Sequence, residues 1–230
     1  MLTRIVMSAL LAGLVAGVVS FATGMWKTSP IIVHAEVFEQ QASMAETSSA
    51  SEAKADEGEH WAPENGFERS LWTFIAGVVT TTGFAFMLVG AMVLSGRNVG
   101  LKEGVIWGLC AFAAIFAWPS LGLAPEPPGL VAADLGARQL WWLFTVVSAL
   151  TALVLLLLKD GALWKVAGLL LLAIPYVIGA PRVEVSAGNV PAEIASEFAA
   201  ASLVLTAVTF LVLGGASGFF YEKFERYSRT

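Results

Sequence analysis

The side chains that could bind a metal ion are histidines and carboxylates of the hydrophilic segments. They are His34, Glu36, Glu39, His60, Glu126 and Asp134. Imidazole and carboxylate ligands together suit divalent first-row metals such as cobalt, nickel or zinc, although these ligand types do not select one of them. In a helix Glu36 and Glu39 would share a face and His34 would not, so a complete site needs ligands from elsewhere. The alternative interpretation is that the acids only keep a loop hydrated.

A second polar group stands at the start of the apolar run 140–158. It consists of Arg138, Gln139, Trp141 and Trp142. Tryptophan favours the membrane interface, and a polar cluster in this position suits a gate or a docking surface for a partner. The simpler interpretation is that Arg138 forms an ion pair with Asp134.

An ion path across the apolar runs would lack charged ligands, because no charged side chain lies deep within them. Hydroxyl groups and carbonyls released by proline are the groups that remain. The candidates for such a path are Thr80, Thr81, Thr82, Pro119 and Pro175.

Signatures of catalysis are missing from the sequence, which contains no Walker A loop, dinucleotide-binding glycine motif, HExxH or GxSxG. The chain alone is therefore not an ATPase, and no enzymatic activity, nucleic-acid partner or permanently bound cofactor is expected. Both histidines lie outside the apolar runs, which excludes a haem held between two histidines inside a membrane. Cys110 is the only cysteine, so a disulfide within the chain is impossible.

The elements that must position these residues are membrane helices. Of the 230 residues 57% are hydrophobic and only 13% charged, against roughly 25% charged residues in soluble domains. A helix needs about 20 apolar residues to cross the ~30 Å hydrocarbon core. Six runs reach or approach this length: 5–25, 74–94, 105–123, 140–158, 163–180 and 199–221.

We therefore predict an all-α integral membrane protein, a bundle of about six transmembrane helices with an acidic, partly disordered outer loop. The chain divides into a first transmembrane helix (1–26), an acidic periplasmic loop (27–70) and a membrane bundle of five further helices (71–230). Within the loop, 31–40 is expected to extend the first helix, whereas 41–59 is rich in Ser, Ala and Glu and is expected to be disordered.

The first run is predicted to be a retained helix, because no small-x-small cleavage site of a signal peptide follows it. The run 163–180 is the weakest span, since it is short and carries Lys165 near its start. Close helix packing is expected at three small-xxx-small pairs. These are Gly13 with Gly17, Gly104 with Gly108, and Gly214 with Gly218.

The positions of Lys and Arg support six spans. With six spans one side of the membrane receives Arg4, Arg97, Lys102, Lys159, Lys165, Lys223, Arg226 and Arg229. The positive-inside rule makes this side the cytoplasm, so both termini are expected there. Most acids fall on the opposite side. Without the fifth span the C-terminal basic cluster would lie outside, which argues against five spans.

Several segments in order resemble the cobalt transporter subunit CbtA family. They are HAEVFE, WAPENGFERS, WGLCAFAAIFAWPSLGLAPEPPG, ADLGARQLWW, IPYVIGAP and VPAEIASEF. The resemblance covers nearly the whole chain, and such a series is more specific than any single motif. It would place a histidine after Pro175, where this chain has Tyr176.

This resemblance implies an inner-membrane component of bacterial cobalt uptake that serves cobalamin synthesis. The transported ion would be cobalt(II), bound at the outer face and passed inward. It also implies a small single-span membrane partner, CbtB-like, whose histidine motif would supply ligands that this chain lacks. The alternative hypothesis is a membrane scaffold that does not transport and anchors a periplasmic partner through the acidic loop.

Overall fold

The structure is a computed structural model that describes residues 1–49, 63–64, 66–183 and 190–227. The described residues form helices and connecting loops, with no strand among them. The first helical rod runs through α1 (Leu2–Thr23), the π-helical turn η1 (Gly24–Thr28) and α2 (Ser29–Ser49). The predicted extension of the first helix is thus confirmed, but Gln41–Ser49 is helical where disorder was predicted. The remainder of that predicted segment, 50–59, lies outside the described residues.

The later helices coincide with the other apolar runs. They are α3 (Phe67–Leu94), α4 (Leu101–Phe112) with η2 (Ala113–Ala117) and α5 (Trp118–Ser120), α6 (Leu135–Leu158), α7 (Ala162–Ile178) and α8 (Ala192–Tyr227). Within the part of the chain that the structure describes, five helices are long and apolar enough to cross a membrane. The sixth, α7, has 17 residues and is the weak run recognised in the sequence. The all-helical membrane fold is therefore confirmed.

Both π-helical turns end two residues before a proline, namely Pro30 and Pro119. Proline lacks the N–H that would bond to the carbonyl four residues earlier, and its ring clashes with that carbonyl. A wider π-helical turn relieves the clash and keeps the helix continuous. In this way α4, η2 and α5 form a single rod of 20 residues, Leu101–Ser120.

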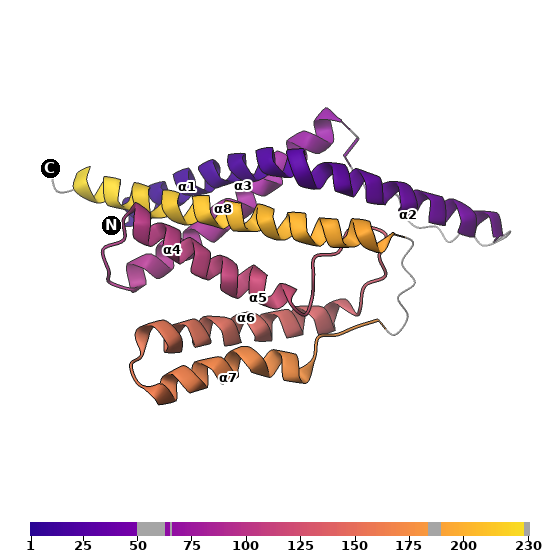
Figure 1. The fold of residues 1–230 in the computed structure, drawn as a ribbon. Helices are drawn as coiled ribbons and strands as arrows, with labels where there is room; N and C mark the ends of the chain where they lie inside the picture. The colour runs from indigo at the N-terminus through magenta and orange to yellow at the C-terminus, as the bar shows by residue number, and fades with distance from the viewer. Residues whose placement is uncertain (50–62, 65, 184–189, 228–230) are drawn as a thin grey trace.

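The helices form two bodies, as Figure 1 shows. The rods α1, α3, α4 and α8 pack into a bundle, and α6 with α7 makes a helical hairpin beside it. Both termini lie at one end of the molecule, together with the α3–α4 and α6–α7 connections (Figure 1). We call this the terminal end, and the opposite end, reached by α2, the distal end.

Glycine seams hold the bundle together at very short range. A Cβ added to Gly108 would lie 2.1 Å from the Phe210 carbonyl oxygen, and one added to Gly104 would lie 2.3 Å from that of Gly214. The pairs predicted on α4 and α8 therefore pack against each other. On the other side of the bundle, a Cβ at Gly13 would lie 2.4 Å from the Thr82 hydroxyl. Only glycine permits this approach of the backbones.

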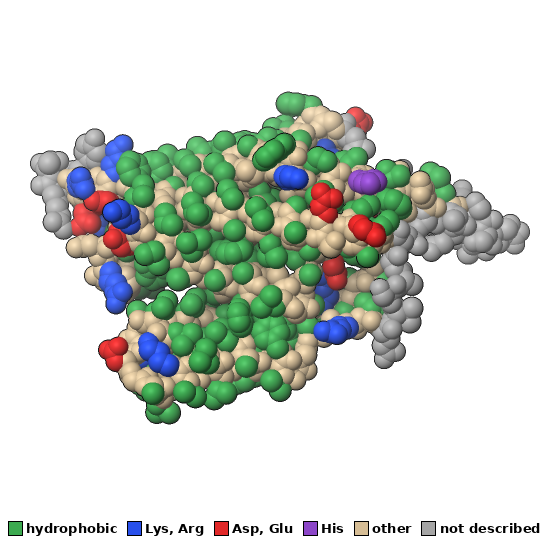
Figure 2. Space-filling view, viewed as in Figure 1, with side chains coloured by type: hydrophobic (Ala, Val, Ile, Leu, Met, Phe, Trp, Pro, Cys, Tyr) green, Lys and Arg blue, Asp and Glu red, His purple; other side chains and the backbone are tan. Residues whose placement is uncertain are grey.

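A wide apolar band separates two charged ends on the face shown in Figure 2. Many large hydrophobic side chains in this band are exposed, such as Val79 and Leu169. Exposed apolar surface over all the long helices is stable only in contact with lipid tails. Lys165 of α7 donates to the carbonyl of Leu156 at the end of α6, so its ammonium satisfies a free helix-end carbonyl.

Candidate functional site

The distal end is organised around a small apolar cluster. Ile31 and Ala35 of α2 are buried against Val190 and Ile194 at the start of α8. Leu130, from the loop between α5 and α6, packs on the same cluster. Three segments that are far apart in the sequence are therefore fixed side by side, and they carry most of the predicted metal ligands.

Glu36 on α2 is paired with Arg69 in the first turn of α3. Arg69 Nη1 donates to Glu36 Oε2 at 3.0 Å, and Nη2 donates to Oε1, so the pair is bidentate. Both residues lie beyond the apolar runs 5–25 and 74–94. The hydrogen bonds from Arg69 hold the pKa of the Glu36 carboxyl below its ordinary value. Arg69 was not among the predicted site residues, because nothing local in the sequence indicates this contact.

Glu126 and Arg138 form a second ion pair, with Arg138 Nη2 2.9 Å from Glu126 Oε2. The simpler interpretation of the sequence, a pair between Arg138 and Asp134, is therefore wrong. Asp134 is instead the N-cap of α6, and its Oδ1 accepts a hydrogen bond from the Ala137 backbone N–H at 2.9 Å. The cap turns the Asp134 carboxylate toward the helix end, which leaves Glu126 as the partner of Arg138.

His34 and Glu39 lie on the exposed part of α2. The His34 ring packs against Phe38 at a centroid distance of 5.5 Å. Glu39 lies against the loop between α5 and α6, since a Cβ added to Gly129 of that loop would be 3.1 Å from the Glu39 Cβ. Gly129 has a φ of +84°, which only glycine adopts without strain. The sixth predicted ligand, His60, lies outside the described residues.

The distal end thus brings α2 and the α5–α6 loop together, as expected, but it uses their carboxylates in two separate ion pairs. Among the described residues, no three His, Cys, Asp or Glu side chains are close enough to hold one metal ion. A cation that binds Glu36 or Glu126 must compete with an arginine, and further ligands must come from another segment or subunit. The metal-binding role of the six residues stays a prediction.

The residues predicted as a gate or docking surface lie together beside α5. Arg138, Gln139 and Trp142 line a cavity of about 340 Å³ with Pro119. Trp142 Nε1 donates to the Ile115 carbonyl at 3.2 Å, the carbonyl that Pro119 cannot satisfy. Trp141 is buried, and its Nε1 donates to the Pro175 carbonyl at 3.2 Å. The Trp142 indole anchors the hairpin to the bundle, whereas the Trp141 indole joins α6 to α7 within the hairpin. Whether the group also gates or docks a partner stays a prediction.

Tyr176 completes this aromatic anchor. Its ring makes edge contacts with Trp118 and Trp141 at centroid distances of 5.7 and 5.9 Å. The Tyr176 hydroxyl donates to the Trp118 carbonyl, and Trp118 Nε1 donates to the Leu172 carbonyl at 3.2 Å. The residue that stands in place of the histidine implied by the resemblance therefore joins α7 to α5.

The threonines of the predicted path lie at a closed helix contact. Thr81 is buried and donates to the Gly13 carbonyl at 2.8 Å, while Thr82 packs directly on Gly13. Thr80 is exposed on α3. In this conformation the hydroxyls of Thr81 and Thr82 serve the packing of α1 on α3, and their role in ion passage stays a prediction.

A lipid-facing helical bundle with charged ends defines a multi-pass membrane protein. The family model described as "Probable cobalt transporter subunit (CbtA)" matches residues 2–222, which is nearly the whole chain. The protein belongs to this family. No similar curated protein and no similar solved structure were found.

Proposed function

We propose that this protein is the inner-membrane subunit of a bacterial cobalt uptake system, which binds the cation at its outer face and passes it inward. The observation that carries the proposal is the match to the family of probable cobalt transporter subunits over residues 2–222. It acts with a small single-span, CbtB-like partner. This role requires neither an enzymatic activity nor a permanently bound cofactor, and cobalt(II) is the transported substrate.

The distal end is the proposed capture region and faces the periplasm. Its support is the meeting of α2, the α5–α6 loop and the start of α8, which places His34, Glu36 and Glu39 on the same end as Glu126 and Asp134. The basic residues gathered near the terminal end support the opposite, cytoplasmic assignment of that end. Excess carboxylates concentrate cations locally before any of them is coordinated.

The proposed capture step exchanges an arginine for the metal. Arg69 and Arg138 neutralise Glu36 and Glu126 while no cation is bound, which avoids repulsion between carboxylates. When cobalt(II) arrives, the carboxylate leaves its arginine, and the histidines of the partner complete the coordination. Because hexacoordinate cations need more ligands than this end offers within the described residues, the partner is an integral part of the site.

The test is cobalt accumulation in cells that depend on this gene, with the partner co-expressed and membrane abundance checked by immunoblot. Loss of one ligand should lower accumulation roughly tenfold in His34→Ala, Glu36→Gln and Glu126→Gln. Glu197→Gln is the matched control, because Glu197 is an exposed carboxylate near the start of α8 outside the proposed ligand set. Accumulation in that control should equal wild type.

Arg69→Gln separates a metal ligand from a structural ion pair. If Arg69 competes with cobalt for Glu36, its removal should maintain or raise accumulation at low cobalt while Glu36→Gln lowers it. If the pair only holds α2 on α3, the two variants should lose accumulation equally. Normal uptake in all point variants, together with loss of uptake on deletion of 41–59, would show that this segment captures the metal in place of the distal end. Uptake that is independent of the gene would favour the scaffold hypothesis.

A further inference from the structure

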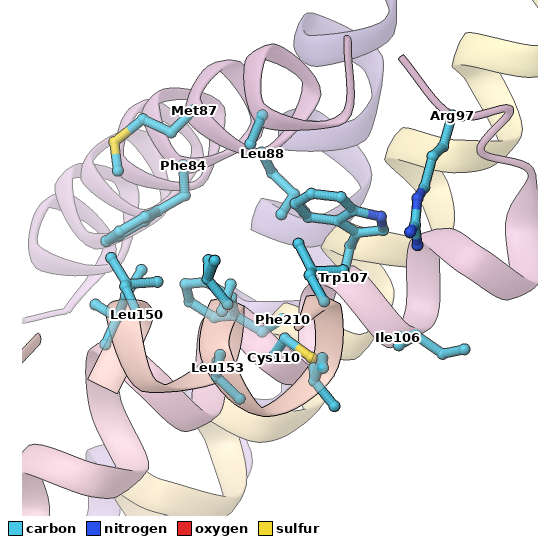
Figure 3. Close-up of a pocket in the computed structure, with 16 residues that line it drawn as sticks. Phe84, Met87, Leu88, Arg97, Ile106, Trp107, Cys110, Leu150, Leu153 and Phe210 are labelled. Carbon is cyan, nitrogen blue, oxygen red and sulfur yellow. The ribbon is translucent and has the colours of Figure 1, made fainter. Parts of the chain in front are cut away.

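An apolar cavity separates the α6–α7 hairpin from the bundle near the terminal end. The cavity has a volume of about 410 Å³ and is lined by α3, α4 and α6, with Phe210 of α8 (Figure 3). This volume lies in the range of roughly 300–1,000 Å³ typical of small-molecule sites. The hairpin joins the bundle mainly through η2 and α5. Between this junction and the terminal end, the hairpin and the bundle are separated by the cavity.

The lining of the cavity extends over about the thickness of one leaflet. On α6 its lining runs from Leu150 to Leu158, and along α4 and η2 it runs from Ile106 to Ile115. At 1.5 Å per residue these stretches span about 12 and 14 Å, roughly half of the ~30 Å hydrocarbon core. At the Ile115 end of the lining the hairpin contacts the bundle, because Trp142 Nε1 donates to the Ile115 carbonyl.

A single cation stands at the other end of the cavity. Arg97 and Trp107 lie at that end, and Phe84 and Leu150 lie at the far end (Figure 3). Arg97 is exposed in the α3–α4 connection and forms no ion pair with a described carboxylate. Apart from Arg97, the lining is apolar or weakly polar, and Cys110 contributes a half-buried thiol.

We propose that this cavity binds an acyl chain of an anionic phospholipid whose phosphate pairs with Arg97. Arginine matches phosphate geometry through its planar set of donors, and the apolar wall matches one chain of the adjacent leaflet. A partner helix fits the cavity less well. Such a helix is about 10 Å wide and must cross the whole ~30 Å core, whereas the lining of this cavity extends over only about half of that distance. The site is independent of the proposed cobalt transport.

The bound chain fills the gap between hairpin and bundle, and the phosphate fixes it at the membrane surface. Charge-assisted hydrogen bonds to one arginine give roughly tenfold preference for a lipid that offers an accessible anionic phosphate. We therefore expect the protein to retain phosphatidylglycerol in preference to phosphatidylcholine, whose choline group offsets the charge of its phosphate.

The experiment is native mass spectrometry of the purified full chain in detergent with equal amounts of the two lipids. Wild type should retain one phosphatidylglycerol, and Arg97→Gln should lower its occupancy roughly tenfold, with partial recovery in Arg97→Lys. Lys102→Gln is the matched control, because Lys102 is exposed near the same end but lies outside the cavity lining. It should behave as wild type.

Cys110 provides a second readout without any new label, since it is the only cysteine and lines the cavity. Phosphatidylglycerol should slow its reaction with a small thiol reagent in wild type but not in Arg97→Gln. Leu153→Trp, which fills the cavity, should reduce lipid retention while Arg97 is intact. Equal retention of both lipids, or equal losses in Arg97→Gln and Lys102→Gln, would overturn the proposal. A co-purifying membrane helix that crosslinks to Cys110 would also overturn it, by showing a protein occupant.

Discussion

At the scale of single residues, Pro119 deprives one carbonyl of its usual donor and Trp142 supplies another. Pro119 cannot donate to the Ile115 carbonyl, and Trp142 reaches it from α6. An unsatisfied carbonyl inside a bilayer is costly because no water replaces the missing bond. The Trp142 indole therefore combines two functions, since it satisfies the backbone of η2 and attaches α6 to it.

Trp142→Phe should lower stability by about 1 kcal/mol, the value of one such hydrogen bond. In a Pro119→Ala background the backbone N–H gained by the substitution can satisfy the Ile115 carbonyl, so the same Trp142→Phe change should cost less. Thermal unfolding of the four proteins in detergent measures this coupling. Additive effects of the two changes would show that Pro119 and Trp142 act independently.

The Glu36–Arg69 pair makes a pH-dependent contribution to stability. Its bidentate geometry and partial exposure suggest about 1 kcal/mol. The pKa of Glu36 is lowered in the folded state, so this stabilisation is complete above the unfolded pKa of about 4.3. It is lost as the pH falls through the lower, folded pKa. Glu36→Gln should therefore unfold more easily than wild type at pH 7, with the difference shrinking in acid. A difference constant with pH would contradict this assignment.

The spacing of Asp134 and Arg138 in the sequence suggested an ion pair across one helical turn. The structure differs because Asp134 is a capping residue with non-helical backbone angles, and its carboxylate is already engaged. The partner of each arginine depends on tertiary packing, which no local pattern records. For the same reason the ligand types at the distal end could be predicted from the sequence, but their separation into two ion pairs could not.

At the scale of helices, glycine decides which rods approach closely. Gly108→Ala would drive a methyl group into the Phe210 carbonyl at 2.1 Å and force α4 away from α8, costing roughly 1–3 kcal/mol. Gly77 on α3 is the matched control, because a Cβ there meets no atom within 4 Å. Gly77→Ala should leave the midpoint of thermal unfolding unchanged or raise it. Equal losses in both variants would indicate a general intolerance of alanine rather than a packing seam.

The extent of the helices was predictable where it followed from apolar run length, and less so elsewhere. All six runs form helices because a bilayer leaves the backbone no other means of satisfying its hydrogen bonds. The end of α2 could not be placed from composition. The polar segment from Gln41 onward was predicted to be disordered, yet α2 docks through Ile31 and Ala35 and continues to Ser49. Tertiary contacts of the first turns stabilise the helix that follows.

At the scale of the whole molecule, the hairpin and the bundle are fixed to each other near the distal end and separated near the terminal end. The aromatic anchor, Trp118, Trp141, Trp142 and Tyr176, closes the first region, and the apolar cavity opens the second. A two-body protein joined at one end can change its opening at the other by small rotations of the hairpin. The lipid proposed beside Arg97 occupies the cavity whose width such a rotation would change.

The remaining prediction concerns the number of crossings, and it depends on α7. Its 17 residues span about 25 Å, slightly less than the hydrocarbon core. Yet α7 runs antiparallel to α6 over its length (Figure 1), and Lys165 is accommodated at the terminal end by the Leu156 carbonyl. A slightly short helix can be matched by local thinning of the bilayer at modest cost.

Six crossings place both termini on one side, so reporter fusions after Lys102, Lys159 and Thr230 should all report the cytoplasm. Fusions within the acidic loop, after Gly129 or after Arg182 should report the periplasm. A cytoplasmic signal at Lys159 combined with a periplasmic signal at Thr230 would show that α7 does not cross, and would reduce the protein to five spans.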